Sequence, residues 1–370
     1  MKKIGRRVAS VLCAIALLLP LGVRAQAKEN AAETCDIKPV LSECVECSGE
    51  VKISSRLWEL LFGKKDEEVL LIPGGTVFGA KVKQSFVTVS DAGDAEGAKE
   101  GDIIISIDGK DIKSIKDVKD ILSKSEGRAL NMLLKRGGGE VNATVTPKKV
   151  GKEYRLGMLL KDGAAGIGTI TYINPKTGEF GGLGHGICDT GSTEPIEIIS
   201  GEVTGVILGG VQKGEDGKPG ELRGILTDRH LGEVYCNTSS GVFGKLDNIP
   251  NGENIKCLEA AKREEVHEGD ATILSTIKNG QPSEFKIKIT EIDREADGAK
   301  SFKIKVTDPA LITLTGGIVR GMSGSPIIQD GKLVGAVTHV MVANSTEGYG
   351  IFIENMLSAS QTARDELPAA

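Results

Sequence analysis

The chain has 370 residues, which is room for two domains. Its formal charge of -5 arises from 46 Lys and Arg against 51 Asp and Glu, and the basic residues are scattered, so no electrostatic footprint for nucleic acid is present. The 49 glycines, 8 phenylalanines and single tryptophan indicate many turns and short strands, and a mainly β fold is therefore expected.

Residues 1–27 have the pattern of an export signal. Four basic residues among the first seven precede the apolar run Val8–Val23, and the tripeptide Ala-Gln-Ala at 25–27 fits a small-residue cleavage site. The apolar run contains Pro20 and is shorter than the roughly 20 residues that a membrane helix requires. The segment is expected to direct export, either as a removed signal peptide or as a retained membrane anchor.

Residues 28–68 are expected to form a juxtamembrane linker. Their amphipathic patch, Ser55–Phe62, is expected to pack on the next domain, with a membrane surface as the alternative. Of the seven cysteines, two form a single CxxC, Cys44–Cys47, without a second pair, which favours a disulfide or free thiols over zinc. No cysteine is assigned a catalytic role, and neither a metal nor a cofactor is expected.

The stretch 69–150 is predicted to be an α+β domain. Strand Ile103–Ile107 lies between Gly-Asp and Asp-Gly turns, and Lys116–Leu122 carries apolar residues at helical spacing. This order resembles a PDZ domain, a fold that binds an extended peptide as an added strand. The resemblance implies a peptide-binding loop and strand at the following residues, with a plain connecting loop as the alternative: Gly74, Gly75, Thr76, Val77, Phe78 and Gly79.

A second, strand-rich domain is predicted over 151–358, followed by a short polar tail at 359–370. A predicted hairpin that begins with a strand at 167–173 ends in His185, which lies between two glycines. An imidazole in such a bend can reach a neighbouring loop, although a structural histidine is the alternative. The other histidines are expected to pack locally or to lie on the surface: His339, His230 and His267.

The glycine-rich turn Gly321–Pro326 contains two serines and precedes two short apolar runs joined by a tight turn. Glycines on both sides of Ser323 allow a backbone in which the hydroxyl is exposed and N–H groups point at the same spot, as acyl transfer requires. A plain turn is the alternative. The stretch resembles the nucleophile loop of chymotrypsin-like serine peptidases, which implies that Ser323 is the nucleophile. The same resemblance implies an oxyanion hole formed by the N–H groups of Gly321 and Ser323, and no role for Ser325.

The run GHGICD around His185 and the run VTDPALITLTGGIVRGMSGSPIIQDGKLVGAVTHV extend the resemblance. Together with the PDZ-like unit they resemble the stage IV sporulation protein B (SpoIVB) peptidase family over about Val69–Leu357. The resemblance implies a PDZ domain followed by a chymotrypsin-like double β-barrel, with His185 as general base. It also implies Asp308 as the acidic partner. Because Asp308 lies only fifteen residues before Ser323, two other acids stay open: Asp189 and Asp228.

Membership of that family implies a serine endopeptidase of sporulation signalling, located between forespore and mother cell. It would cleave itself and a protein substrate that regulates an intramembrane metalloprotease, which leads to activation of a late sigma factor. A peptide segment would occupy the PDZ groove, and the N-terminal segment would contact the membrane. Two alternatives stay open: a PDZ-containing signalling adaptor without proteolysis, and a general envelope quality-control serine protease.

Overall fold

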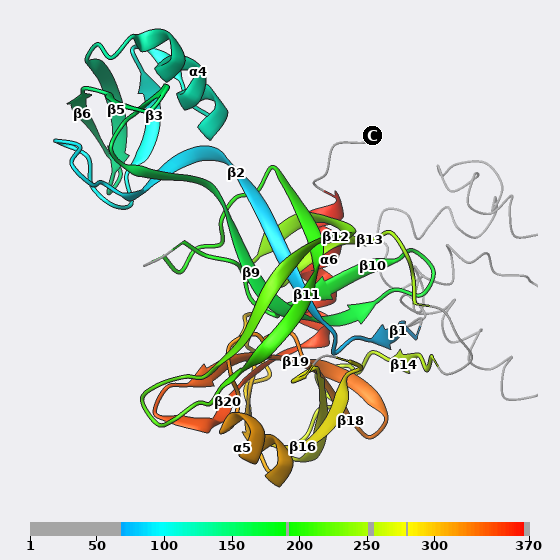
Figure 1. Cartoon of the computed structure of the whole chain (residues 1–370). Helices are drawn as coiled ribbons and strands as arrows, with labels where there is room; N and C mark the ends of the chain where they lie inside the picture. The colour runs from blue at the N-terminus through cyan, green and yellow to red at the C-terminus, as the bar shows by residue number, and fades with distance from the viewer. Residues whose placement is uncertain (1–67, 190–191, 251–254, 279, 366–370) are drawn as a thin grey trace, which may run out of the picture. The chain divides into compact units, whose positions relative to one another are not determined.

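The computed structural model of the chain describes residues 68–189, 192–250, 255–278 and 280–365 (Figure 1). The predicted export segment and nearly all of the predicted linker lie outside these ranges. Within them, no helix is both long enough and apolar enough to span a membrane.

An α+β unit occupies the first part of the described chain. Its strands and helix follow one another in this order: β3 (Ile103–Ile107), β4 (Lys110–Asp111), α4 (Ile115–Ser125), β5 (Leu130–Arg136), β6 (Gly139–Val145), β7 (Lys148–Val150) and β8 (Glu153–Arg155). Val118 and Leu122 of α4 pack into a core that runs from Val87 to Leu156 in the sequence. This confirms the predicted strand and helix.

Helix α4 begins where its sequence provides a complete N-terminal cap. The Ser114 hydroxyl accepts a hydrogen bond from the Asp117 N–H, and the Asp117 carboxylate accepts one from the Ser114 N–H. The capping box satisfies N–H groups that have no partner inside the helix. The helix therefore starts at Ile115 and ends before Glu126, which has a left-handed conformation.

Two long strands, β2 (Val77–Asp91) and β9 (Leu159–Ile173), belong both to the α+β unit and to the barrel that follows. They pair antiparallel from Val77 opposite Thr169 to Lys83 opposite Gly163. After an irregularity the pairing resumes at Thr88, and β2 then pairs with β3 of the α+β unit. One pair of strands therefore connects the two cores, both covalently and through strand pairing on each side of the irregularity.

The first barrel contains six strands that close on themselves because β9 pairs with both β10 and β2. In addition to β2 and β9, these are β10 (Glu179–Gly182), β11 (Ser200–Gln212), β12 (Glu221–Thr238) and β13 (Gly241–Leu246). Two short strands extend the sheet: β1 (Leu70–Pro73) and β14 (Leu258–Glu259). Phe78 and Phe180 are fully buried in its core, with ring centroids 5.6 Å apart in an edge-to-face arrangement.

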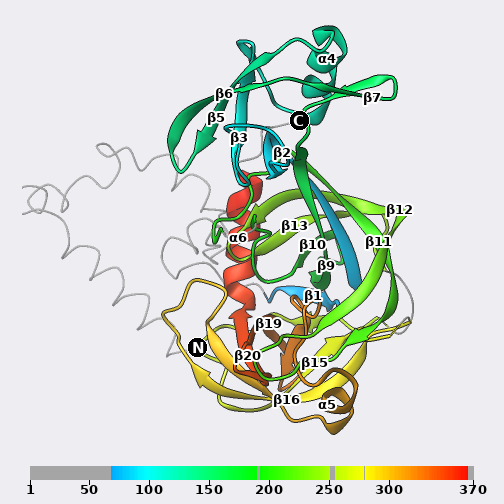
Figure 2. The ribbon, with the colours of Figure 1, turned by 60° about the vertical axis from the view of Figure 1, so that its left-hand side comes forward.

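The second barrel is closed by strands that are consecutive in space: β15 (Gly269–Ser275), β16 (Ser283–Ile292), β17 (Phe302–Val306), β20 (Asn344–Phe352), β19 (Lys332–Met341) and β18 (Pro326–Gln329). Helix α5 (Pro309–Thr315) follows β17, and α6 (Ile353–Asp365) follows β20. Figure 2 shows α6 running from the end of β20 in the second barrel alongside β13 of the first. Its Met356 belongs to one buried cluster with Phe243 of the first barrel and Leu333 of the second. The expected mainly β fold is present, and α6 seals the junction of the barrels.

The structure corrects the predicted peptide-binding loop of the α+β unit. The N–H groups of Gly74 and Gly75 donate to the carbonyls of Thr171 and Ile170, at 2.9 and 2.7 Å. Phe78 has no exposed surface. The whole predicted set lies in or beside the first barrel: Gly74, Gly75, Thr76, Val77, Phe78 and Gly79. Because these backbone groups are already used by β9, they cannot capture a peptide, and the predicted domain start at residue 69 is too early.

Candidate active site

The loop 320–325 is held on the barrels by its carbonyl groups. Each of its six carbonyl oxygens accepts a hydrogen bond: Arg320 O from Leu222 N (2.9 Å), Gly321 O from Thr169 Oγ1 (2.8 Å), Met322 O from Ser325 N (2.9 Å), Ser323 O from Thr169 N (2.9 Å), Gly324 O from Thr171 Oγ1 (2.8 Å) and Ser325 O from Val337 N (2.9 Å). The orientation of every peptide plane in the loop is therefore fixed.

The N–H groups of the same loop divide into two classes. Four of them donate to backbone carbonyls: Arg320, Met322, Gly324 and Ser325. The N–H groups of Gly321 and Ser323 have no acceptor among the described residues. In a trans peptide the N–H points away from the carbonyl, so the fixed carbonyls of Arg320 and Met322 hold these two N–H groups in place. Two unused, oriented donors are what an oxyanion hole requires.

The two serines of the loop have different surroundings. The Ser323 side chain is half-buried, and its hydroxyl donates to the Thr338 carbonyl at 2.6 Å. Ser325 has no exposed surface, and its hydroxyl donates to that of Ser275 at 3.1 Å. Gly324 has φ +94°, and a Cβ there would lie 2.0 Å from the Thr169 carbonyl oxygen, so only glycine fits. The loop thus leaves Ser323 accessible and encloses Ser325.

His185 lies in the bend after β10, where Leu183 and Gly184 both have positive φ. Its Nδ1 is 2.9 Å from the Gly186 carbonyl oxygen. The tautomer with the proton on Nδ1 satisfies this contact and leaves Nε2 to accept a proton. Burial lowers the pKa of His185, which the Gly186 carbonyl partly offsets. The imidazole is therefore neutral at pH 7, the state that a general base needs.

His339 joins the site, which the sequence did not predict. Its ring centroid lies 4.7 Å from that of His185, with the planes tilted by 35°. Its Nδ1 is buried and has no hydrogen-bond partner among the described residues. Burial, together with the neighbouring His185 and Lys300, lowers the pKa of His339 to about 4. A second neutral imidazole therefore packs against His185.

Strand β19 brings the serine and the histidine bend together. Thr338 accepts the hydroxyl of Ser323, and the next residue, His339, contacts His185. A Cβ on Gly184 would lie 3.0 Å from the Thr338 methyl, so the bend rests directly on this strand. Ser323 and His185 therefore contact adjacent residues of one strand.

Both histidines line a cavity of about 840 Å³. Its walls include the His185 bend as far as Cys188, residues between Ser192 and Pro195, Ser239, and the segment Ala296–Lys300. A cavity of this size accommodates several side chains of a bound ligand. Among the residues that the structure describes, no three His, Cys, Asp or Glu side chains gather where they could hold a metal ion.

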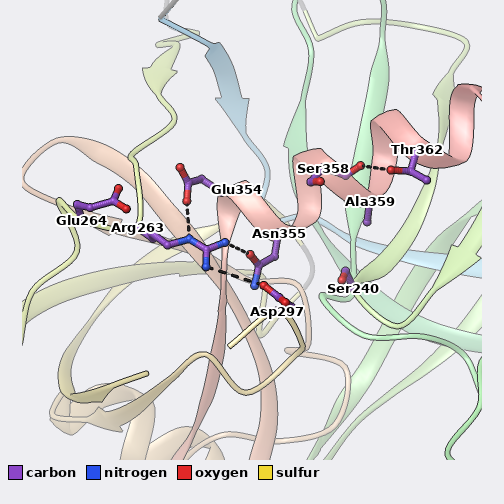
Figure 3. A pocket seen from close by; sticks show the side chains of 9 residues that line it. All are labelled: Ser240, Arg263, Glu264, Asp297, Glu354, Asn355, Ser358, Ala359 and Thr362. Carbon is purple, nitrogen blue, oxygen red and sulfur yellow. Dashed lines mark hydrogen bonds and ion pairs between the residues drawn. The ribbon is translucent and has the colours of Figure 1, made fainter. Parts of the chain in front are cut away.

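A second pocket of about 520 Å³ also includes Asp297, and Figure 3 shows how its residues are bonded. The Arg263 guanidinium donates to the Glu354 carboxylate at 2.9 Å and to the Asn355 side chain at 2.8 Å. Asn355 in turn donates to the Ala296 carbonyl at 3.0 Å. These bonds hold the segment that forms a wall of the larger cavity.

None of the three candidate acids forms a bond to His185. Asp308 caps α5, where it accepts from the N–H groups of Ala310 (2.9 Å) and Leu311 (3.2 Å) and from that of Lys286 (3.2 Å). Asp189 pairs with Lys161 at 2.6 Å, and Asp228 is exposed on β12. The predicted role of Asp308 beside His185 therefore has no contact to support it, whereas its capping role has two and a third bond ties it to β16.

The substitution Asp308→Asn separates these roles. Asparagine caps helices about as well as aspartate. If Asp308 only caps the helix, the cleavage rate should therefore change by less than about tenfold. If Asp308 instead orients His185, the cleavage rate should fall by about 10⁴, as turnover does after the corresponding change in trypsin. Cleavage rates and melting temperatures of Asp308→Asn and Asp189→Asn would be compared. A loss of about 10⁴ in Asp308→Asn with the fold intact would contradict the capping interpretation.

Comparison with protein families gives two matches. A model described as SpoIVB peptidase S55 matches residues 152–357, which is more than half of the chain. A PDZ domain model matches residues 89–136, which lie within the α+β unit.

Individual proteins match this chain either over a short stretch or at low sequence identity. Serine protease HTRA1 from Xenopus tropicalis is 48% identical over 54 residues, covering 15% of this chain and 12% of that protein. The chain thus spans about an eighth of the length of that relative. The active form of Rv3671c protease from M. tuberculosis is 12% identical, with 56% of this chain and 77% of that chain covered and a TM-score of 0.32. The HtrA-type protease AlgW with decapeptide is also 12% identical, with 59% and 56% covered and a TM-score of 0.34.

Proposed function

This chain belongs to the SpoIVB peptidase S55 family and contains a PDZ domain, and we propose that it is a chymotrypsin-like serine endopeptidase that acts in sporulation signalling. The family resemblance predicted from the sequence is confirmed, as is the fold class, a PDZ domain with a double β-barrel peptidase. One observation carries the proposed mechanism. In the loop 320–325, only the two N–H groups beside the candidate nucleophile have no acceptor among the described residues.

In the proposed mechanism the Ser323 hydroxyl turns from the Thr338 carbonyl toward the substrate. His185 accepts the hydroxyl proton on Nε2 while the serine oxygen attacks the peptide carbonyl, and it later donates that proton to the leaving amine. The Gly186 carbonyl holds the proton on Nδ1, which is the task that an aspartate performs in trypsin. The N–H groups of Gly321 and Ser323 stabilise the oxyanion.

The proposed substrates are the chain itself and a regulator of an intramembrane metalloprotease, whose cleavage leads to activation of a late sigma factor. The proposed location is the space between forespore and mother cell, reached through the segment 1–27. These proposals are supported by membership of the SpoIVB family. The test is mass spectrometry of the N-terminus of the purified full chain over time, with and without the regulator protein.

The outcomes of this test differ between the candidate functions. A sporulation protease produces few defined cuts in itself and in the regulator. If unfolded casein is added as a second substrate, a quality-control protease would degrade it at many sites. An adaptor would leave every protein intact, and that result would contradict the proposed function.

The PDZ domain is proposed to bind an extended protein segment and thereby to position or restrain the peptidase. Its core lies between Val87 and Leu156 of the sequence, so it can be removed as a unit. Lys83 and Gly163 face each other across β2 and β9. An Asn-Gly turn in place of residues 84–162 would therefore close a hairpin at the edge of the first barrel.

This replacement should preserve peptide-bond cleavage and change either the timing of self-cleavage or the choice of protein substrate. The measurement is a time course of both reactions for the shortened and full chains at equal concentration. A control variant, Lys161→Ala, loses the ion pair to Asp189 but keeps the domain. Unchanged timing together with unchanged processing of the partner would contradict the proposed role.

A further inference from the structure

Two buried threonines of β9 hold the loop that carries Ser323. Thr169 and Thr171 have no exposed surface and lie two residues apart, so both side chains are on one face of the strand. The Thr169 hydroxyl donates to the Gly321 carbonyl, and the Thr171 hydroxyl donates to the Gly324 carbonyl, both at 2.8 Å. The Thr169 N–H also donates to the Ser323 carbonyl at 2.9 Å. Strand β9 therefore binds three of the six carbonyls in the loop.

The two bonds of Thr169 lie on either side of the Met322–Ser323 peptide, which provides one of the two unused N–H groups. The strand and the loop are in direct contact there, because Gly324 has no side chain to separate them. A loop whose carbonyls are held on both sides cannot rotate the peptide between them without breaking a bond. The orientation of the Ser323 N–H thus depends on β9, in addition to the bond from the Ser325 N–H to the Met322 carbonyl.

We propose that Thr169, supported by Thr171, is a positioning residue for peptide-bond cleavage. Its hydroxyl fixes the Gly321–Met322 peptide and so keeps the N–H groups of Gly321 and Ser323 directed at the developing oxyanion. The side chain does not contact the reacting atoms and acts only through the loop. This inference rests on the proposed function of Ser323 as nucleophile.

The same strand extends into the PDZ domain. Its first residues pair with β2 beside the PDZ core, and Asp162 accepts a hydrogen bond from the Ile115 N–H at the start of α4, at 3.0 Å. Asp162 thus contacts the PDZ helix directly, and Thr169 and Thr171, which hold the nucleophile loop, follow it by seven and nine residues in the same strand. Strand β9 therefore connects that helix to the loop, with hydrogen bonds at both ends.

The test is the rate at which a fluorophosphonate probe labels Ser323 in the full chain, measured by mass spectrometry. Thr169→Val keeps the shape of the side chain but leaves the Gly321 carbonyl without its donor, so labelling should slow about ten- to hundredfold. Thr169→Ser restores the hydroxyl and should label at close to the wild-type rate. Thr204→Val is the matched control, since Thr204 is equally buried and its hydroxyl faces the Gly79 carbonyl instead, at 3.4 Å.

Melting temperatures of all four proteins separate positioning from general stability. The inference predicts that both valine variants melt earlier, while only Thr169→Val labels slowly. Equal labelling of wild type and Thr169→Val, or equal slowing in Thr204→Val, would overturn it. If Thr169→Val does not fold, Thr171→Val carries the same test with a smaller expected slowing. A wild-type chain that is not labelled would instead overturn the proposed function, and the inference with it.

Discussion

Replacement of Ser323 by alanine should remove nearly all cleavage by this protein. Loss of the nucleophile in subtilisin costs about 10⁶ in turnover, and here no second hydroxyl in the loop is accessible. The half-buried Ser323 side chain contributes a single hydrogen bond, to the Thr338 carbonyl, so the fold should survive. The measurement is the time course of self-cleavage and of partner cleavage by mass spectrometry.

Ser325→Ala is the matched control for this prediction. Its fully buried hydroxyl bonds to Ser275, so its removal should cost about 1 kcal/mol of stability and only a modest factor in rate. Ser275→Ala removes the same bond from the other side and should behave alike. Cleavage that persists in Ser323→Ala, or that disappears in Ser325→Ala with the fold intact, would show that Ser323 is not the nucleophile.

His185→Gln should reduce turnover almost as strongly, by about 10⁶, as the loss of either the histidine or the serine does in subtilisin. Glutamine keeps the approximate size and polarity of imidazole but cannot accept the serine proton. His230→Gln is the control, because this histidine is exposed and pairs only with acidic side chains on the surface. An equal loss of turnover in His185→Gln and His230→Gln would contradict the role of His185 as general base.

The dependence of cleavage on pH tests the state of the same histidine. Only the neutral imidazole accepts a proton, and burial lowers the pKa of His185 from its ordinary value of 6.5. The value of kcat/KM should therefore decline as pH falls, with a midpoint below pH 6.5. His339, with a pKa lowered to about 4, adds no charge in the range from pH 5 to 7. A midpoint above pH 6.5 would contradict the assignment.

The sequence predicted those features that depend on neighbouring residues. Ser323 and His185 could both be proposed as candidate site residues, because each lies within three positions of the glycines that define its loop. The helix beginning at Ile115 could be predicted for the same reason, since its cap and its apolar spacing are local. The PDZ resemblance likewise rested on a continuous stretch of sequence.

The features that the sequence did not reveal depend on pairing between distant strands. Nothing in the loop Gly74–Gly79 indicates that its backbone is bonded to β9, almost one hundred residues further along the chain. Asp308 follows a family pattern, yet the proline after it starts a helix that the carboxylate caps. The alternation in GIGTIT places Thr169 and Thr171 on one face of a strand, and this was the available signal for a buried polar pair.

Covalent labelling is the most direct test of Ser323 as the activated nucleophile of a serine endopeptidase. The purified full chain would be treated with a fluorophosphonate probe, and the modified residue would be identified by peptide mapping. The structure predicts a single phosphonate on Ser323 in the wild type and in Ser325→Ala, and none in Ser323→Ala or His185→Gln. Labelling at any other residue, or labelling that persists in Ser323→Ala, would contradict the claim.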